Sequence, residues 1–287
     1  MCAAVLRVPG SSLGVRAEGL GGDSDAADQA QTWVPPSAEA WMQHCTIPRL
    51  PLPPPGSAFG PLPAGDAPYI AVLPTGRNAE LAWRLERKQL LAEMGGATCT
   101  PSQAGSVRTG IEEMELREYI EEWMGRELSR APSENRYVFG EFGEQWAPFR
   151  DAYTRPPCRF CEGDKAAVTL GLGGLHSGAP WHFHNAAFVE VLHGAKHFAL
   201  LPPGDVAIPM VQRGIGNLSQ FHWHMEERPA LERAGFLAEL QECVVMPGEM
   251  LYFPDQWLHG VVNMHPYTAF VSTFVQMDGI VRNSDSL

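Results

Sequence analysis

Three histidines are placed so that they could bind one metal ion. His182 and His184 are two residues apart, and in a β-strand such side chains leave the same face, so both imidazoles can converge on one ion. Imidazole is a ligand for iron, zinc, copper and nickel, so the pair alone does not name the metal. Further on, residues 250–253 have the pattern of a buried strand that Pro254 ends, which places His259 at a strand end. Together the three predict a metal site on a small β-barrel.

Two other motifs have a similar spacing but weaker surroundings. His222 and His224 repeat the spacing of the first pair without a following strand or a proline-bounded partner segment, so we predict a structural role or a place at the barrel mouth. Cys158 and Cys161 form a CxxC pair, but no second pair and no suitably spaced histidine accompanies it. We therefore expect two unrelated thiols in a loop there.

The chain reads as helices followed by short strands. Helical periodicity is present in residues 78–94, which a Gly-Gly pair ends, and in residues 112–127, whose second face is acidic. From residue 137 on, short apolar runs broken by Gly and Pro are typical of a barrel or sandwich. These runs are Tyr137–Phe139, Ala166–Leu172, Phe188–Leu192, His197–Leu201, Cys243–Val245, Met250–Phe253 and Tyr267–Val275. The segment 204–241, with a helical pattern at 230–240, is predicted to be an insertion that shapes substrate access.

Composition separates a folded body from a leading segment. The 287 residues are 45% hydrophobic and 9% aromatic, which is enough for the core of an enzyme-sized domain. Pro and Gly concentrate in the first third, and residues 1–33 have few large apolar side chains, so we expect disorder there. The predicted organisation is a Pro/Gly-rich, largely disordered segment at 1–66, a helical part at 67–134, a barrel at 135–280 and a tail at 281–287.

Charge and targeting signals restrict partners and compartment. The formal net charge of −12, without a Lys/Arg cluster, argues against nucleic acid. An acidic surface keeps a protein soluble and would also attract a basic protein or peptide. No apolar stretch is long enough to cross a bilayer, and the run at residues 3–6 is too short for a signal peptide. The six scattered cysteines fit a reducing compartment. We expect an intracellular protein, cytoplasmic or nuclear, with no membrane partner, and a lumenal one only if a signal sequence is missing from the chain.

The segments 178–184, 194–203 and 248–259 resemble the jumonji C family of the cupin superfamily. The resemblance covers roughly residues 135–280. It implies a mainly β fold, a double-stranded β-helix with N-terminal helices packed on it.

The same resemblance implies an activity and its residues. His182, His184 and His259 would bind Fe(II), Lys196 would hold the carboxylate of 2-oxoglutarate, and a protein or peptide side chain would be hydroxylated. Three neutral imidazoles leave coordination positions for a keto acid and dioxygen, and a buried ammonium would pair the distal carboxylate. A lysine without this role would extend to solvent.

The sequence departs from the family pattern at two positions. His184 stands where the family usually has a carboxylate, which removes one negative charge at the metal. Ala179 stands where many hydroxylases of the family have a Thr or Tyr hydroxyl for the co-substrate, and Thr273 is our candidate to supply that polar contact. Glu190 is a candidate replacement carboxylate or an ordinary residue of the barrel wall.

Three functions therefore stay open. The first is an Fe(II)- and 2-oxoglutarate-dependent dioxygenase that hydroxylates protein. The second is a non-catalytic jumonji-like scaffold that binds protein partners, which His184 and Ala179 favour. The third is a three-histidine cupin that does not use 2-oxoglutarate and would not need Lys196.

Overall fold

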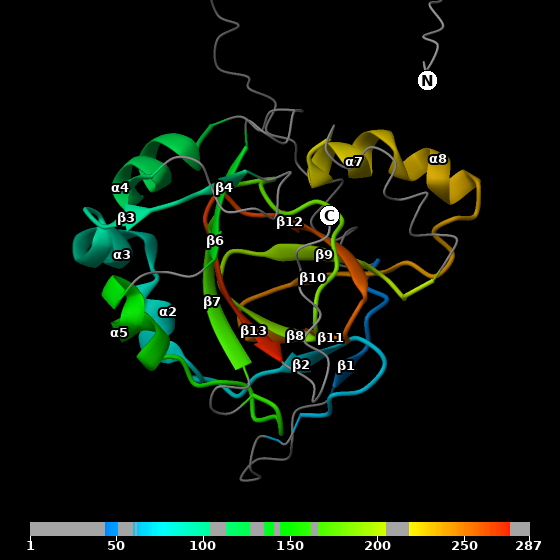
Figure 1. Cartoon of the computed structure of the whole chain (residues 1–287), viewed down its shortest axis with the longest axis horizontal. Coiled ribbons are helices and arrows are strands. Elements are labelled where there is room, and N and C mark those ends of the chain that lie inside the picture. Colours follow the sequence, from blue (N-terminus) through cyan, green and yellow to red (C-terminus); the bar gives the residue numbers. More distant parts are fainter. Residues whose placement is uncertain are drawn as a thin grey trace, which may run out of the picture.

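The computed structural model describes residues 44–50, 60, 62–103, 113–126, 135–140, 144–161, 166–204 and 218–275. Within these residues two sheets face each other, one layer of helices covers the outer face of the larger sheet, and two further helices pack on the smaller one (Figure 1). The expected mainly β fold with helices packed on a barrel is confirmed.

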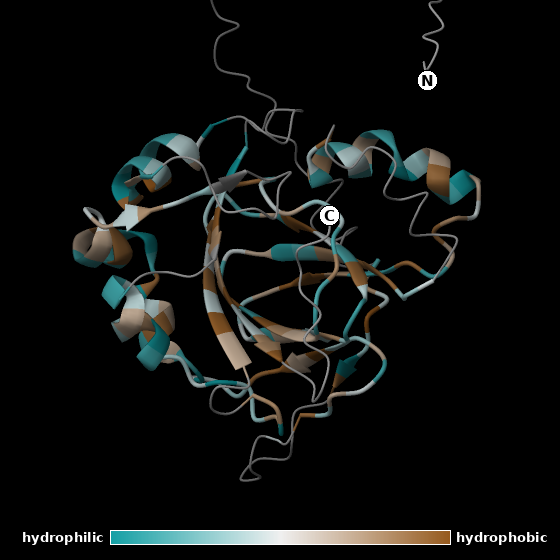
Figure 2. Cartoon of the chain, in the orientation of Figure 1, coloured by the Kyte–Doolittle hydropathy of each residue, from teal (hydrophilic) through white to brown (hydrophobic). Residues whose placement is uncertain are grey.

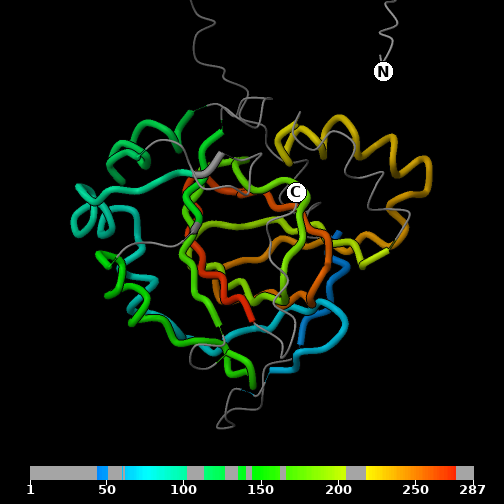
Figure 3. The backbone as a smooth tube through the Cα atoms, viewed as in Figure 1, coloured from blue at the N-terminus to red at the C-terminus, as the bar shows by residue number. Residues whose placement is uncertain are grey.

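The larger sheet interleaves strands from distant parts of the chain. In spatial order its eight strands are β1 (Arg49–Leu50), β2 (Tyr69–Val72), β11 (Glu249–Phe253), β8 (Ala187–His193), β13 (Thr268–Val275), β7 (Ala166–Gly173), β6 (Arg136–Gly140) and β4 (Ser102–Gln103). Only β1 and β2 pair in parallel, and the other neighbours are antiparallel. The tube in Figure 3 shows the blue and cyan residues of β1 and β2 beside orange and green strands from later in the chain.

The smaller sheet supplies the opposite wall of the barrel. It consists of β10 (Gln241–Val245), β9 (Lys196–Leu201) and β12 (Leu258–Asn263), all antiparallel. Side chains alternate along these strands: Phe198 and Leu200 enter the core between the sheets, while Ala199 and Leu201 face outward. In Figure 2 brown, hydrophobic stretches run along the central strands and more teal appears on the helices.

Helices cover the outer face of the larger sheet. They are α2 (Ala79–Arg84), α3 (Arg87–Met94), α4 (Leu116–Glu118), the π-helical turn η1 (Tyr119–Trp123), the 3-10 turn η3 (Glu144–Trp146) and α5 (Ala147–Asp151). Their apolar side chains, such as Leu81, Tyr119 and Trp146, pack with Leu170 of β7 and Val271 of β13. Between α3 and α4 the chain forms a two-stranded ribbon of β3 (Thr98–Cys99) and β5 (Met114–Glu115).

The predicted helices are shorter than expected. The helix predicted over 78–94 is broken into α2 and α3 because Glu86 adopts an extended conformation, with φ −57° and ψ 132°. The helix predicted over 112–127 begins only at Leu116 and continues as a π-helical turn. All seven predicted strands are present, whereas β2 and β12 were not predicted as strands.

Part of the segment predicted to be Pro/Gly-rich and largely disordered packs on the barrel. Ile47 is buried in the core between the sheets, and β1 pairs with β2. The disorder expected for residues 1–33 falls outside the described residues, as does the tail at 281–287. The remaining domain boundaries stay predictions.

The expectation of unpaired cysteines is wrong at four positions. Cys45 is bonded to Cys243, and Cys158 to Cys161, while Cys99 is a buried free thiol. Both pairs bring together thiols whose spacing in the sequence gave no disulfide pattern, so the scattered cysteines do not argue for a reducing compartment. Among the described residues no helix is long and apolar enough to cross a membrane.

The insertion docks through a buried carboxylate. Its helices are α7 (Gln220–Glu226) and α8 (Arg228–Arg233), so helix begins ten residues earlier than the pattern at 230–240 predicted. Glu242 of β10 accepts hydrogen bonds from Arg228 at 2.7 and 2.6 Å and lies 3.1 Å from His197 Nε2. Burial by itself raises the pKa of Glu242, but His197 and Arg228 together hold that pKa well below its usual value.

Replacing Glu242 by Gln is expected to lower the free energy of unfolding at pH 7 by about 3 kcal/mol, because Arg228 would lose its buried partner. Since the folded pKa lies below the usual value of 4.5, this stabilisation is present above that pH and is lost as the pH falls toward the folded pKa. Denaturant unfolding at pH 7 and pH 3 would measure both effects. The control Glu232→Gln removes the 47% exposed carboxylate that also pairs with Arg228 and should cost less than about 1 kcal/mol. Equal losses in the two variants at pH 7 would contradict the assignment.

Candidate metal centre

A backbone pairing brings the histidines together. His182, in the segment between β7 and β8, forms an isolated antiparallel bridge with His259, the second residue of β12, through N–H to carbonyl bonds of 2.9 and 2.8 Å. His184 follows closely, and its carbonyl accepts a bond from the Gln256 N–H at 3.1 Å. The two segments that the sequence singled out are therefore neighbours, although His182 lies at a bridge rather than within a regular strand.

All three imidazoles are held by the same kind of hydrogen bond. The Nδ1 atoms of His182, His184 and His259 lie 2.7, 2.6 and 2.8 Å from the backbone carbonyl oxygens of Pro180, Asn185 and Trp257. A carbonyl oxygen can only accept, so each Nδ1 carries the proton and each Nε2 keeps its lone pair. Such hydrogen bonds orient metal-binding imidazoles in proteins.

The free nitrogens converge. One ligand atom from each of His182, His184 and His259 lies within 4.8 Å of the others. The Nε2 atoms of His184 and His259 are 3.1 Å apart, and because both Nδ1 atoms are protonated, two lone pairs face each other. A cation between them would relieve this repulsion, so the donor set fits a divalent metal ion.

The site keeps its histidines neutral. Burial, helped by the neighbouring His182, lowers the pKa of His184 to about 3, and burial also lowers the pKa of His182 and, further, that of His259. His259 is buried, while His182 and His184 are half-buried. Neutral imidazoles offer lone pairs to a metal at neutral pH without first losing a proton.

Lys196 places a cation next to this cluster. Its Nζ donates to the Tyr137 hydroxyl at 3.3 Å and to Asn263 Oδ1 at 3.2 Å, and it lies 4.0 Å from the centroid of the Phe270 ring. The residue is 1% exposed, and no carboxylate among the described residues forms an ion pair with it. Burial lowers the pKa of Lys196 well below its usual value. Burial thus disfavours the charged form, and an anion bound beside Lys196 would restore it, so this position fits a carboxylate.

Asn263 fixes the lysine head group. Its Nδ2 donates to Ser177 Oγ at 3.0 Å, and Ser177 Oγ donates to the Gly174 carbonyl at 2.7 Å. With Nδ2 held in this way, Oδ1 must face Lys196, so the amide orientation is determined by its partners. Asn263 is the last residue of β12, the strand that also carries His259.

Tyr137 was not recognised as a site residue. It was predicted only as the start of a strand, and its side chain reaches Lys196 from β6, far away in sequence. The signal that could have identified Tyr137 is its hydroxyl group, which stands at a core-facing position of the strand. There the ring stacks with Phe139 and Phe270.

Two other candidates lie on the opposite face of the larger sheet. Thr273 Oγ1 reaches the Tyr153 hydroxyl at 3.5 Å. Glu190 accepts hydrogen bonds from Asn78 Nδ2 at 3.0 and 2.9 Å, and burial raises its pKa to about 7. The structure does not bring either residue to the three histidines, and the hydroxyl that contacts Lys196 is that of Tyr137.

The second histidine pair does not form a metal site. His222 and His224 lie on α7, where residues two apart point to different sides of the helix. Ser219 caps the helix and lies 2.8 Å from His222 Nδ1, whereas His224 is buried 3.3 Å from Gln220 Nε2. The predicted structural role agrees with this placement.

Comparisons with known proteins agree with the fold. Residues 88–279 match the model of the cupin-like domain. The chain is 30% identical to JmjC domain-containing protein 8 of Rattus norvegicus over 200 residues, which is 69% of this chain and 71% of the rat protein. It is 29% identical to the Homo sapiens protein of the same name, over 69% of this chain and 72% of that protein. Lysine-specific demethylase JMJ21 of Arabidopsis thaliana is 30% identical over 148 residues, 48% of this chain and 14% of the plant protein.

The barrel, the converging histidines and these matches lead to one conclusion. The chain belongs to the cupin-like (JmjC) domain family.

Proposed function

We propose that this protein is an Fe(II)- and 2-oxoglutarate-dependent dioxygenase that hydroxylates a side chain of a protein or peptide. The observation that carries the proposal is the presence of two features in one barrel. One is the set of three neutral imidazoles whose ligand atoms converge, and the other is the buried amino group of Lys196, which pairs with no carboxylate among the described residues. The first fits a divalent metal, and the second fits a carboxylate of a metal-bound keto acid.

The residues of this chain have separate tasks in that reaction. His182, His184 and His259 would hold Fe(II), which together with 2-oxoglutarate and dioxygen supplies the oxidising chemistry. Lys196 and the Tyr137 hydroxyl would bind and orient the distal carboxylate of the co-substrate. Three protein ligands would leave coordination positions on the metal for small molecules.

Aromatic side chains pack against the histidines. The Phe253 ring centroid lies 4.4 Å from that of His259 and 5.5 Å from that of His184, and the Phe274 centroid lies 4.8 Å from that of His184. These apolar contacts keep the imidazoles in place and lower the local dielectric, which strengthens the attraction between Lys196 and a carboxylate.

A protein substrate is supported by similarity alone. The names of two relatives, a lysine-specific demethylase and an HSPB1-associated protein homologue of Danio rerio, refer to action on or association with proteins. The net charge of −12 is compatible with a basic peptide.

A second candidate function rests on His184. With an imidazole in place of a carboxylate, the metal carries one more net positive charge, as in cupins that oxidise substrates without a keto acid. In that case Lys196 would serve the substrate's own anionic group, and turnover would not depend on 2-oxoglutarate.

Replacing His182 or His259 by Ala is expected to abolish stoichiometric iron binding, since each change removes one of three ligands. Iron per chain after anaerobic loading with Fe(II) and desalting would be measured by elemental analysis. The control His224→Ala removes a buried histidine outside the cluster and should leave the iron content unchanged. Full iron content in both ligand variants would rule out the assigned site.

Replacing Lys196 by Met should weaken 2-oxoglutarate binding to the Fe(II) form at least tenfold while iron stays bound, because the ammonium contacts the carboxylate and not the metal. Titration monitored by the visible charge-transfer band of the keto acid on iron gives the affinity. Tyr137→Phe, which removes only the hydroxyl, should have a smaller effect of the same sign. Iron without any 2-oxoglutarate band in the wild type would favour the second candidate.

Replacing His184 by Asp tests whether the third imidazole suits the co-substrate. The carboxylate returns a negative charge to the metal, so iron should remain bound and 2-oxoglutarate should still bind. The rate of succinate formation in the two proteins is the measurement. Turnover that appears only in the Asp variant would show that the natural site is not a 2-oxoglutarate oxygenase.

A further inference from the structure

One disulfide joins the leading segment to strand β10. Cys45 and Cys243 are 198 residues apart in sequence. The two sulfurs differ in access, because Cys45 is half-buried in the leading segment whereas Cys243 is 1% exposed and faces the core between the sheets. An external thiol can therefore reach Cys45 and not Cys243.

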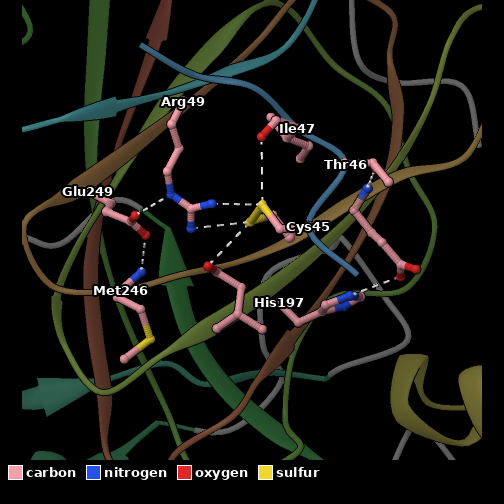
Figure 4. Close-up of a disulfide and its surroundings, with 10 residues drawn as sticks. Cys45, Thr46, Ile47, Arg49, His197, Met246 and Glu249 are labelled. Carbon is pink, nitrogen blue, oxygen red and sulfur yellow. Dashed lines mark hydrogen bonds and ion pairs between the residues drawn. A yellow bond between two sulfur atoms is a disulfide. The ribbon is translucent and has the colours of Figure 1, made fainter. Parts of the chain in front are cut away.

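A guanidinium group lies against both sulfurs. Arg49 Nη1 is 3.0 Å from Cys45 Sγ, and Arg49 Nη2 is 3.5 Å from Cys243 Sγ, while Nε donates to Glu249 Oε1 at 2.7 Å (Figure 4). The Arg49 side chain is 40% exposed. A disulfide carries no charge, so a cation stabilises it little; the same cation strongly stabilises a thiolate at either sulfur.

The reduced pair also has partners in place. The carbonyl oxygen of Ile47 is 3.6 Å from Cys45 Sγ, and that of Val244 is 3.5 Å from Cys243 Sγ. A disulfide sulfur has no hydrogen to donate to these oxygens, but a thiol has one. Both oxidation states therefore find polar partners without a rearrangement.

The backbone holds the two sulfurs together without the covalent bond. Thr46 N–H donates to the Glu242 carbonyl at 2.9 Å, and Glu242 N–H donates to Thr46 Oγ1 at 2.9 Å, on the residues next to the two cysteines. The pairing of β1 with β2 and the buried side chain of Ile47 anchor the same segment. After reduction the thiols would stay adjacent, which is the condition for forming the bond again.

We propose that Cys45–Cys243 is a reversible thiol–disulfide exchange site whose reaction partner is a thiol of the glutathione class. The partner thiolate attacks Cys45 Sγ, the bond between the two sulfurs breaks, and Cys243 leaves as a thiolate stabilised by Arg49. A second partner thiolate attacks the partner's sulfur in the mixed disulfide, which releases Cys45 as a thiolate and the oxidised partner as its disulfide. Two electrons pass from two partner thiols to the protein, and protons from solvent complete the two cysteine thiols.

The other disulfide provides an internal comparison. Cys158 and Cys161 are 3% and 0% exposed and pack in an apolar cluster with Tyr69, Phe188 and Tyr252. An external thiol has no access to either sulfur in the folded protein. This bond should be reduced only when the chain opens.

The test is a redox titration of the folded full chain in glutathione buffers, with thiols trapped by alkylation and located by mass spectrometry. Cys45–Cys243 should be reduced at a rate proportional to glutathione concentration while Cys158–Cys161 stays oxidised. Arg49→Gln should lower the equilibrium constant for reduction about tenfold, which is about 30 mV for a two-electron couple, and should slow the reaction. Arg49→Lys should recover part of both.

Two controls separate charge from packing. Glu249→Gln breaks the ion pair with Arg49 but keeps the guanidinium, so reduction should be at least as easy as in the wild type. Arg126→Gln removes an exposed guanidinium elsewhere and should change nothing. Cys243→Ser should form a mixed disulfide with glutathione at Cys45, whereas Cys45→Ser should leave Cys243 unmodified in the folded protein.

Three results would overturn the proposal. The first is reduction of Cys45–Cys243 at the rate of global unfolding, independent of glutathione concentration. The second is an Arg49→Gln variant with the wild-type midpoint and rate, and the third is a reduced pair that does not form the disulfide again in oxidised glutathione. The Arg49 series needs no cysteine variant to fold. The outcome does not depend on the metal site or on the proposed oxygenase activity.

Discussion

The backbone bridge between His182 and His259 is the interaction on which the candidate site depends. It joins the segment before β8 to the start of β12, and its two hydrogen bonds fix the backbone positions that carry both imidazoles. His184 is then held through its own carbonyl by Gln256. Because each Nδ1 is bonded to a backbone carbonyl, the ring orientation is set by main-chain geometry and not by flexible side chains. A metal site built in this way is organised before the metal arrives.

Lys196 has no acidic partner among the described residues. Its ammonium is buried and rests on Tyr137, Asn263 and the ring of Phe270, and no described carboxylate forms an ion pair with it. Another buried charged residue, Glu242, is paired with Arg228 and His197. Burying a cation without a partner costs free energy, and a bound anionic ligand offsets that cost. Glu242 therefore belongs to a structural network, whereas Lys196 is the candidate for binding an anion.

The leading segment is part of the domain and not only an appendage. Ile47 enters the core, β1 extends the larger sheet, and Cys45 is bonded to β10. A covalent link across 198 residues closes a long loop and removes much of the entropy of the unfolded chain. The barrel therefore owes part of its stability to residues that composition alone would have set aside.

Alternating apolar runs and the spacing of histidines are local properties of a sequence. They were enough to predict a mainly β fold, seven of its strands and the grouping of the three histidines. The sequence could not reveal β2, whose four residues lie next to a Pro-rich stretch, or the break at Glu86 within a continuous helical pattern. Only the tertiary structure decided that Tyr137 and Asn263 meet Lys196 and that Thr273 and Glu190 face the other side of the sheet. The pairing of Cys45 with Cys243 was equally invisible, since it depends on where the leading segment lies relative to β10. No local sequence pattern predicts contacts between residues far apart in the chain, because sheet order and register decide them.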